Sequence, residues 1–185
     1  PVRDPRSVAA PAETPRIVPT STRPRIVALG DSLTAGLGLD PSQAYPALLQ
    51  AKIDAAGLVY DVVNAGVSGD TSAGGLRRLD WALDGDVRVL IVALGGNDGL
   101  RGLPPEALRA NLASIVEQAR ARDIAVVMAG MEAPPNLGPA YTASFRAVYA
   151  DLARQYDVAL VPIHMNCVMP PMPSGELCYA FGRVL

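Results

Sequence analysis

The chain has 185 residues, half of them hydrophobic, and its 16 basic and 18 acidic side chains leave a net charge of −2. This length and composition fit one domain with a sizeable core. The chain has no basic run and few aromatic residues, which argues against a nucleic-acid partner, and no apolar run approaches the roughly 20 residues of a membrane span.

Residues 1–24 contain six prolines and little apolar patterning, which predicts a disordered, Pro-rich leader. Two interpretations stay open, a tether to an export signal or lipid anchor and an ordinary ragged N-terminus. Cys167 and Cys178 both lie in the last 22 residues and fit either a disulfide of an exported protein or two free thiols. There is no Cys/His cluster, so we predict no metal site.

Apolar runs and helical patterns alternate along the chain. The predicted elements are strand 25–29, helix 42–56, strand 58–63, helix 71–83, strand 87–94, helix 105–122, strand 124–129, helix 139–156 and strand 158–163. Five buried strands separated by helices predict right-handed crossovers and an α/β fold, with a parallel sheet covered on both faces. In such folds the site lies beyond the carboxyl ends of the strands, where the strand order reverses.

Small and polar clusters follow the first three predicted strands. They are Gly30-Asp31-Ser32-Leu33, the run 64–71 (Asn-Ala-Gly-Val-Ser-Gly-Asp-Thr), and Gly95-Gly96-Asn97-Asp98. A plain strand-to-helix turn needs none of these clusters. Their position therefore predicts a functional site built from all three.

Ester hydrolysis needs a nucleophile and hydrogen-bond donors for the oxyanion of the tetrahedral intermediate. Ser32 is the candidate nucleophile, and the Ser32 N–H, the Gly69 N–H and the Asn97 amide would form a three-donor oxyanion hole. Taken singly, Ser32 fits a helix N-cap, Gly69 a turn glycine, and Asn97 a helix cap or loop residue. Asp31 and Asp98 are expected to hydrogen-bond neighbouring backbone groups.

The three clusters resemble the first three sequence blocks of the SGNH/GDSL hydrolases over about residues 25–163. The string from Leu94 to Gly102 (Leu-Gly-Gly-Asn-Asp-Gly-Leu-Arg-Gly) is similar to a narrower group, the bacterial periplasmic thioesterase I, lysophospholipase and arylesterase enzymes. The loop Pro134-Pro135-Asn136-Leu137-Gly138 resembles the substrate-side loop of that group.

The resemblance implies a three-layer flavodoxin-like fold with strand order 2-1-3-4-5, no cofactor, and hydrolysis of short acyl, aryl or thio esters. It implies that Ser32 is the nucleophile and first oxyanion donor, with Gly69 and Asn97 as the other donors. Together with the leader, it favours a periplasmic or secreted bacterial protein.

The last family block, an Asp-x-x-His after strand five, is absent here, and the only histidine is His164. In the implied strand order, strand five lies three spacings, about 14 Å, from strand one. His164 is therefore a weak candidate for the general base, which stays unassigned. Residues 164–185 form an atypical tail, for which we consider a shifted reading frame, a non-catalytic protein, or an unfamiliar base supplied by the tail.

Loss of the final helix of the family is expected to expose apolar surface and to cause self-association or low stability. The leading function is a serine ester hydrolase acting through an acyl-enzyme on Ser32. The alternative is an impaired or non-catalytic acyl-binding module, which the missing base favours. A nucleotide-binding flavodoxin-like protein has little support, because Gly30, Gly36 and Gly38 do not form the dinucleotide fingerprint.

Overall fold

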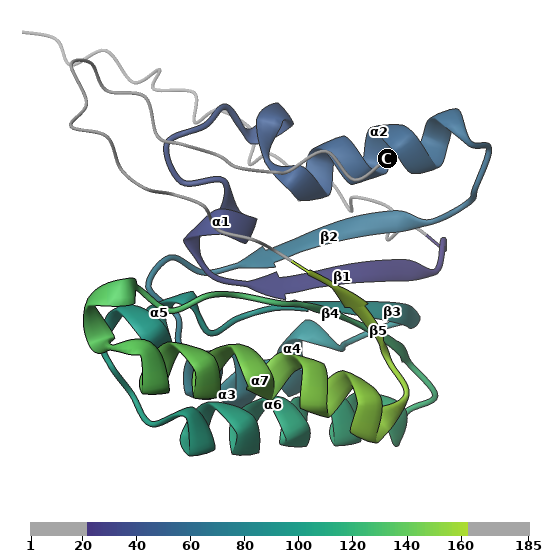
Figure 1. The fold of residues 1–185 in the computed structure, drawn as a ribbon. Helices are drawn as coiled ribbons and strands as arrows, with labels where there is room; N and C mark the ends of the chain where they lie inside the picture. The colour runs from purple at the N-terminus through teal and green to yellow at the C-terminus, as the bar shows by residue number, and fades with distance from the viewer. Residues whose placement is uncertain (1–21, 163–185) are drawn as a thin grey trace, which may run out of the picture.

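The computed structural model describes residues 22–162, which form five parallel strands with helices packed against them (Figure 1). The strands are β1 (Arg25–Gly30), β2 (Asp61–Gly66), β3 (Val87–Ala93), β4 (Ala125–Ala129) and β5 (Ala159–Val161). Their order is β2-β1-β3-β4-β5. The predicted α/β fold and strand order are therefore confirmed. Residues 1–21 of the predicted leader, and the tail with His164, Cys167 and Cys178, lie outside the described residues.

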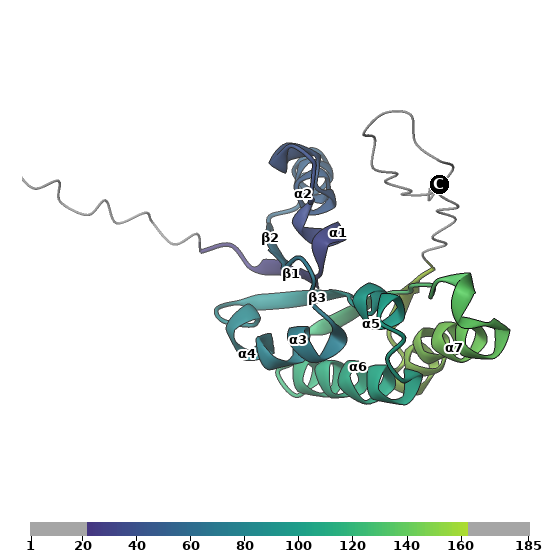
Figure 2. The ribbon, with the colours of Figure 1, turned by 90° about the vertical axis from the view of Figure 1, so that its left-hand side faces the viewer.

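The helices divide between the two faces of the sheet. They are α1 (Ser32–Ala35), α2 (Tyr45–Ala55), α3 (Ser72–Arg77), α4 (Leu79–Ala82), α5 (Gly96–Leu100), α6 (Pro105–Arg120) and α7 (Pro139–Tyr156), with 3-10 turns η1 (Pro41–Gln43) and η2 (Pro135–Leu137). Helices α3, α4, α6 and α7 cover one face, and α1 and α2 lie over β1 and β2 on the other (Figures 1 and 2). None of the helices within residues 22–162 is long and apolar enough to cross a membrane.

The core lies between the sheet and the α3–α4–α6–α7 layer. Successive strand residues point to opposite faces, and alternate residues of β1, β3 and β4 are fully or almost fully buried on this side: Val27, Leu29, Leu90, Val92, Val126 and Met128. The helical period gives α6 a matching apolar stripe of five buried residues, Leu108, Leu112, Ile115, Val116 and Ala119.

The opposite face of β3, β4 and β5 is less well covered. We call Val89, Ile91, Val127, Ala159 and Val161 the open face, because they share this side in register and each is half-buried or exposed. Val161 is 38% exposed. On this side, no helix from residues 22–162 lies over β4 and β5 (Figures 1 and 2). Parallel sheets are normally covered on both faces, so the described part of the chain exposes apolar surface where a covering element is expected.

The second strand begins three residues later than predicted. The apolar residues Leu58 and Val59 suggested an earlier start, but they are exposed in the loop after α2. Pairing with β1 decides the boundary, because Arg25 lies opposite Asp61 and Gly30 opposite Gly66. The start of the polar run 64–71 therefore belongs to the strand end rather than to the loop.

Two predicted helices differ most from the observed ones. Pro46 lies in the first turn of α2, because proline has no N–H to donate within a helix, and the preceding residues form η1 instead. The predicted helix 71–83 breaks at Arg78 into α3 and α4. Arg78 has φ −107° and ψ 10°, and its side chain turns toward the strand ends, as described below.

Candidate active site

The three polar clusters meet at the carboxyl ends of β1, β2 and β3. Gly30, the last residue of β1, lies opposite Gly66 at the end of β2 and Ala93 at the end of β3. The loops that follow these strands therefore start side by side. The structure brings together Ser32, Gly69 and Asn97, which the sequence places far apart.

Ser32 is the first residue of α1, directly after a tight turn. The N-cap is Asp31, whose Oδ1 accepts a 3.0 Å hydrogen bond from the Leu33 N–H. Ser32 is therefore not the capping residue, and its half-buried Oγ accepts or donates no hydrogen bond within residues 22–162. A Cβ at residue 66 would lie 2.2 Å from the Ala35 nitrogen, so only glycine at the end of β2 lets α1 pack this closely.

Gly69 lies in an exposed turn between β2 and α3. Its φ of +83° is in the left-handed region that favours glycine. A Cβ here would approach only the Arg101 guanidinium, at 4.0 Å. The Gly69 carbonyl accepts a 2.9 Å hydrogen bond from Arg101, while its N–H donates to no group in the described chain. This N–H is therefore available to a ligand.

Asn97 in α5 connects the other two clusters. Its Nδ2 donates to the Asp70 carbonyl at 2.9 Å and to Asp31 Oδ2 at 3.3 Å. These partners directly follow Gly69 and directly precede Ser32. An amide nitrogen carries two hydrogens, and both are used here. A bound oxyanion would therefore replace the longer contact, to Asp31.

The carboxylates of Asp31, Asp70 and Asp98 lie next to the site, and each accepts hydrogen bonds within the described chain. Asp31 is 2% exposed, and this burial raises its pKa. The Leu33 N–H acts in the opposite direction, and the charges of Asp70 and Asp98 add to the rise. Asp70 forms a 2.6 Å ion pair with Arg78. The hydrogen bond from the Leu33 N–H confirms the prediction that Asp31 contacts neighbouring backbone.

Asp98 also accepts a hydrogen bond from a backbone N–H, as predicted, but its partner is distant in sequence. Asp98 accepts a 2.7 Å hydrogen bond from the Ser72 N–H and a 2.6 Å bond from the Ser72 hydroxyl, 26 residues away. Asn111 of α6 donates to the same hydroxyl at 2.9 Å. Because both Ser72 and Asp98 are buried, this network fixes α5, and with it Asn97, against α3 and α6.

Sequence reasoning missed two arginines at this site. Arg101 contacts the Gly69 carbonyl, and Arg78 contacts Asp70, Ala65 and Gly30. The partners of Arg78 are 8, 13 and 48 residues away in sequence. An arginine among helix-forming residues is typical of a solvated helix surface, so no sequence signal indicated these contacts.

No histidine that could act as a general base lies within residues 22–162. The chain has one histidine, His164, which lies outside the described range. Residues 22–162 therefore contribute a serine and candidate oxyanion donors but no imidazole.

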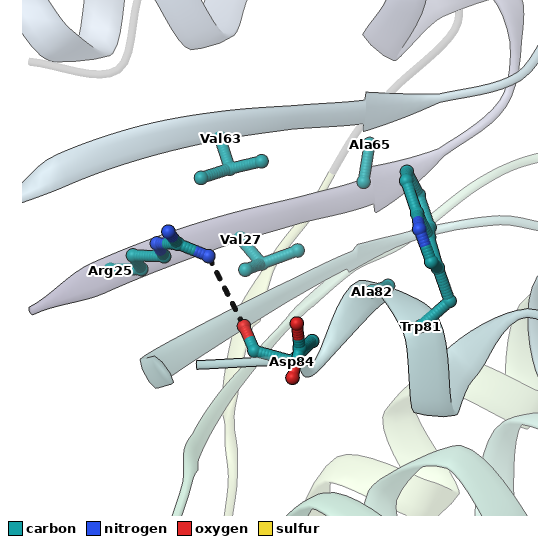
Figure 3. A pocket seen from close by; sticks show the side chains of 7 residues that line it. All are labelled: Arg25, Val27, Val63, Ala65, Trp81, Ala82 and Asp84. Atoms are coloured by element: carbon teal, nitrogen blue, oxygen red, sulfur yellow. Dashed lines mark hydrogen bonds between the residues drawn. The ribbon is translucent and has the colours of Figure 1, made fainter. Parts of the chain in front are cut away.

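A separate hollow lies on the α4 side of β1 and β2 (Figure 3). It is lined by Arg25, Val27, Val63, Ala65, Trp81, Ala82 and Asp84. Arg25 donates a 3.2 Å hydrogen bond to the Asp84 carbonyl. The hollow contains none of the three predicted site residues, so the candidate active site is at the strand ends where the polar clusters meet.

A five-stranded α/β sheet with a serine after β1 and donors after β2 and β3 defines a serine hydrolase of the SGNH type. The chain belongs to the GDSL-like Lipase/Acylhydrolase family, whose model matches residues 28–180. This confirms the family prediction and the assignment to the carboxylic ester hydrolases. The match extends into residues 164–185, and the boundary of the atypical tail stays a prediction.

Individual relatives agree with this assignment. The chain is 49% identical over 144 residues to Esterase TesA of Pseudomonas aeruginosa, covering 77% of this chain and 72% of that protein. It is 40% identical over 142 residues to Thioesterase 1/protease 1/lysophospholipase L1 of Escherichia coli K12, covering 76% and 67%. The crystal structure of AlinE4, an SGNH-hydrolase family esterase, superposes with a TM-score of 0.72 at 46% identity, covering 77% of each chain.

Proposed function

We propose that this chain hydrolyses short acyl, aryl and thio esters through an acyl-enzyme on Ser32, with Ser32, Gly69 and Asn97 as oxyanion donors. The main support is the Asn97 amide, which connects the residue before Ser32 to the residue after Gly69. The similarity to an esterase, a thioesterase/lysophospholipase and an arylesterase supports the substrate class.

In the proposed mechanism, Ser32 Oγ attacks the ester carbonyl and gives a tetrahedral intermediate. Its oxyanion accepts hydrogen bonds from the Ser32 N–H, the Gly69 N–H and the Asn97 amide, which leaves its longer contact with Asp31. Collapse breaks the bond from the carbonyl carbon to the leaving oxygen or sulfur, which takes up the proton that Ser32 gave up. Water then attacks the acyl carbon, the bond to Ser32 Oγ breaks, and a proton from that water returns to Ser32. Fixed donors aimed at the developing charge contribute most of the rate enhancement in such sites.

The proton of Ser32 needs an acceptor. The carboxylates of Asp31, Asp70 and Asp98 already accept hydrogen bonds, so none of them is assigned as the base. His164 follows the described residues and is the one imidazole of the chain. Oxyanion stabilisation alone still leaves residual catalysis in serine hydrolases that lack triad members.

The test is hydrolysis of a short-chain chromogenic aryl ester by the full chain, Ser32→Ala, His164→Ala and Ser68→Ala. Ser68 is an exposed serine one residue before Gly69 and serves as the matched control. We expect Ser32→Ala to abolish turnover and Ser68→Ala to leave it within about twofold. Equal rates for the parent and Ser32→Ala would refute the proposal, and loss of activity in His164→Ala would identify the base.

A second function is favoured by one observation, that residues 22–162 contain no histidine. In this case the chain binds acyl esters without turning them over. Calorimetry with a non-hydrolysable ketone analogue of the ester distinguishes the two functions, since binding without turnover supports the second. The same measurement with Asn97→Ala tests whether binding uses the proposed oxyanion donors.

A further inference from the structure

Arg78 makes three contacts that converge on the site. Its Nε donates to Asp70 Oδ2 at 2.6 Å, and its two terminal nitrogens donate to the Ala65 carbonyl at 2.8 Å and the Gly30 carbonyl at 2.9 Å. The side chain is 18% exposed. A guanidinium presents its donors in a rigid planar fork, so the three acceptors are held in one fixed arrangement.

The three acceptors belong to different parts of the candidate active site. Gly30 ends β1, two residues before Ser32, and Ala65 is the second-last residue of β2. Asp70 directly follows Gly69, and its carbonyl receives the Asn97 amide. One side chain therefore connects the turn that carries the nucleophile with the loop that carries the second oxyanion donor.

The break between α3 and α4 is consistent with this role. Arg78 lies at the junction of the two helices, outside both. Its neighbour Arg77 is exposed in the last turn of α3. The two adjacent arginines thus differ sharply in surroundings, which makes Arg77 a matched control.

We propose that Arg78 is a positioning residue that fixes the Ser32 turn relative to the Gly69 loop. The proposal rests on the ester hydrolase function proposed above. Arg78 touches no reacting atom, and its effect is on the placement of the oxyanion donors. Displacement of reacting groups by about 1 Å costs about 100-fold in rate, and loss of one oxyanion donor costs about 100- to 1,000-fold.

The kinetic experiment compares Arg78→Ala, Arg78→Lys and Arg77→Ala in the full chain. We expect Arg78→Ala to lower kcat about 100-fold with KM within about threefold, because positioning acts on the transition state. Arg78→Lys keeps the charge but loses the planar fork of donors, so its kcat is expected to lie between that of the parent and that of Arg78→Ala. Arg77→Ala is expected to match the parent. Added methylguanidinium should restore at least part of the kcat of Arg78→Ala but leave Arg77→Ala unchanged.

A stability control separates positioning from general destabilisation. Ile115→Ala removes a fully buried side chain of the α6 core. This substitution lowers stability but changes no residue of the candidate active site. If Ile115→Ala, measured at the same fraction folded, loses as much kcat as Arg78→Ala, the positioning role is refuted. An unchanged kcat in Arg78→Ala, or no rescue by methylguanidinium, refutes it as well.

A second readout does not need turnover. In the parent, the amide order parameters of Ser32 and Gly69 are expected to be near the rigid value of about 0.85, and in Arg78→Ala both should fall toward 0.6 or below. Methylguanidinium should return them together. If the parent shows no Ser32-dependent turnover, the proposed function fails, and this measurement still decides the role of Arg78. Unchanged order parameters overturn the positioning role even in an active parent.

Discussion

Removal of the Ser72 hydroxyl tests the buried network that holds Asn97 in place. In Ser72→Ala, the 2.6 Å bond to the Asp98 carboxylate disappears, while the 2.7 Å bond from the Ser72 N–H is retained. A hydrogen bond to a charged group contributes about 1.5–3 kcal/mol. Asn111 also loses its acceptor, but its half-buried amide can bind water. We therefore expect the free energy of unfolding to fall by about 2–3 kcal/mol.

Urea unfolding followed by circular dichroism measures this loss. With a slope of about 2 kcal/mol per molar urea, the midpoint is expected to fall by about 1–1.5 M. Trp81 is 71% exposed, so its fluorescence is a poor probe. The expected loss is a substantial part of the roughly 5–15 kcal/mol that stabilises a typical domain.

Ser114→Ala is the matched control. Ser114 in α6 is half-buried and accepts a 3.1 Å hydrogen bond from the neutral Gln118 amide. We expect this substitution to change stability by no more than about 0.5 kcal/mol, because a neutral bond is replaced by water and alanine favours helix. If the two serine variants lose stability equally, the charged, buried network does not have the energetic role assigned to it.

Two other predictions concern Asp31 and the open face. Burial raises the folded pKa of Asp31 above 3.8, so the folded state binds more protons just above pH 3.8. The difference in free energy of unfolding, parent minus Asp31→Asn, should therefore fall as the pH rises above 3.8 and then level off. A rise in this difference would contradict the assigned burial effect. Because the open face exposes Val161, we expect sedimentation velocity to show concentration-dependent self-association. Val161→Asp should weaken this association more than Val59→Asp, which is the control in the exposed loop after α2. A parent that stays monomeric at every concentration would contradict this prediction.

The sequence alone determined the order and type of the main elements. Apolar runs of strand length alternate with helical stripes, and a chain with that pattern has few ways to bury both faces of its strands. The 2-1-3-4-5 strand order and the roles of Ser32, Gly69 and Asn97 followed from family resemblance. The structure places these residues together, and their catalytic roles stay predictions.

Tertiary structure decided what local pattern leaves open. The start of β2 depends on its register with Arg25 and Gly30 of β1, because several apolar residues in a row fit more than one strand boundary. The partners of Asp98 and Arg78 lie 8 to 48 residues away, and hydrogen bonds at such separations depend on where the chain returns. Side-chain patterns with periods of 2 and 3.6 residues report only which face is buried, so the hydrogen-bond network around Ser32, Gly69 and Asn97 is visible only in the folded chain.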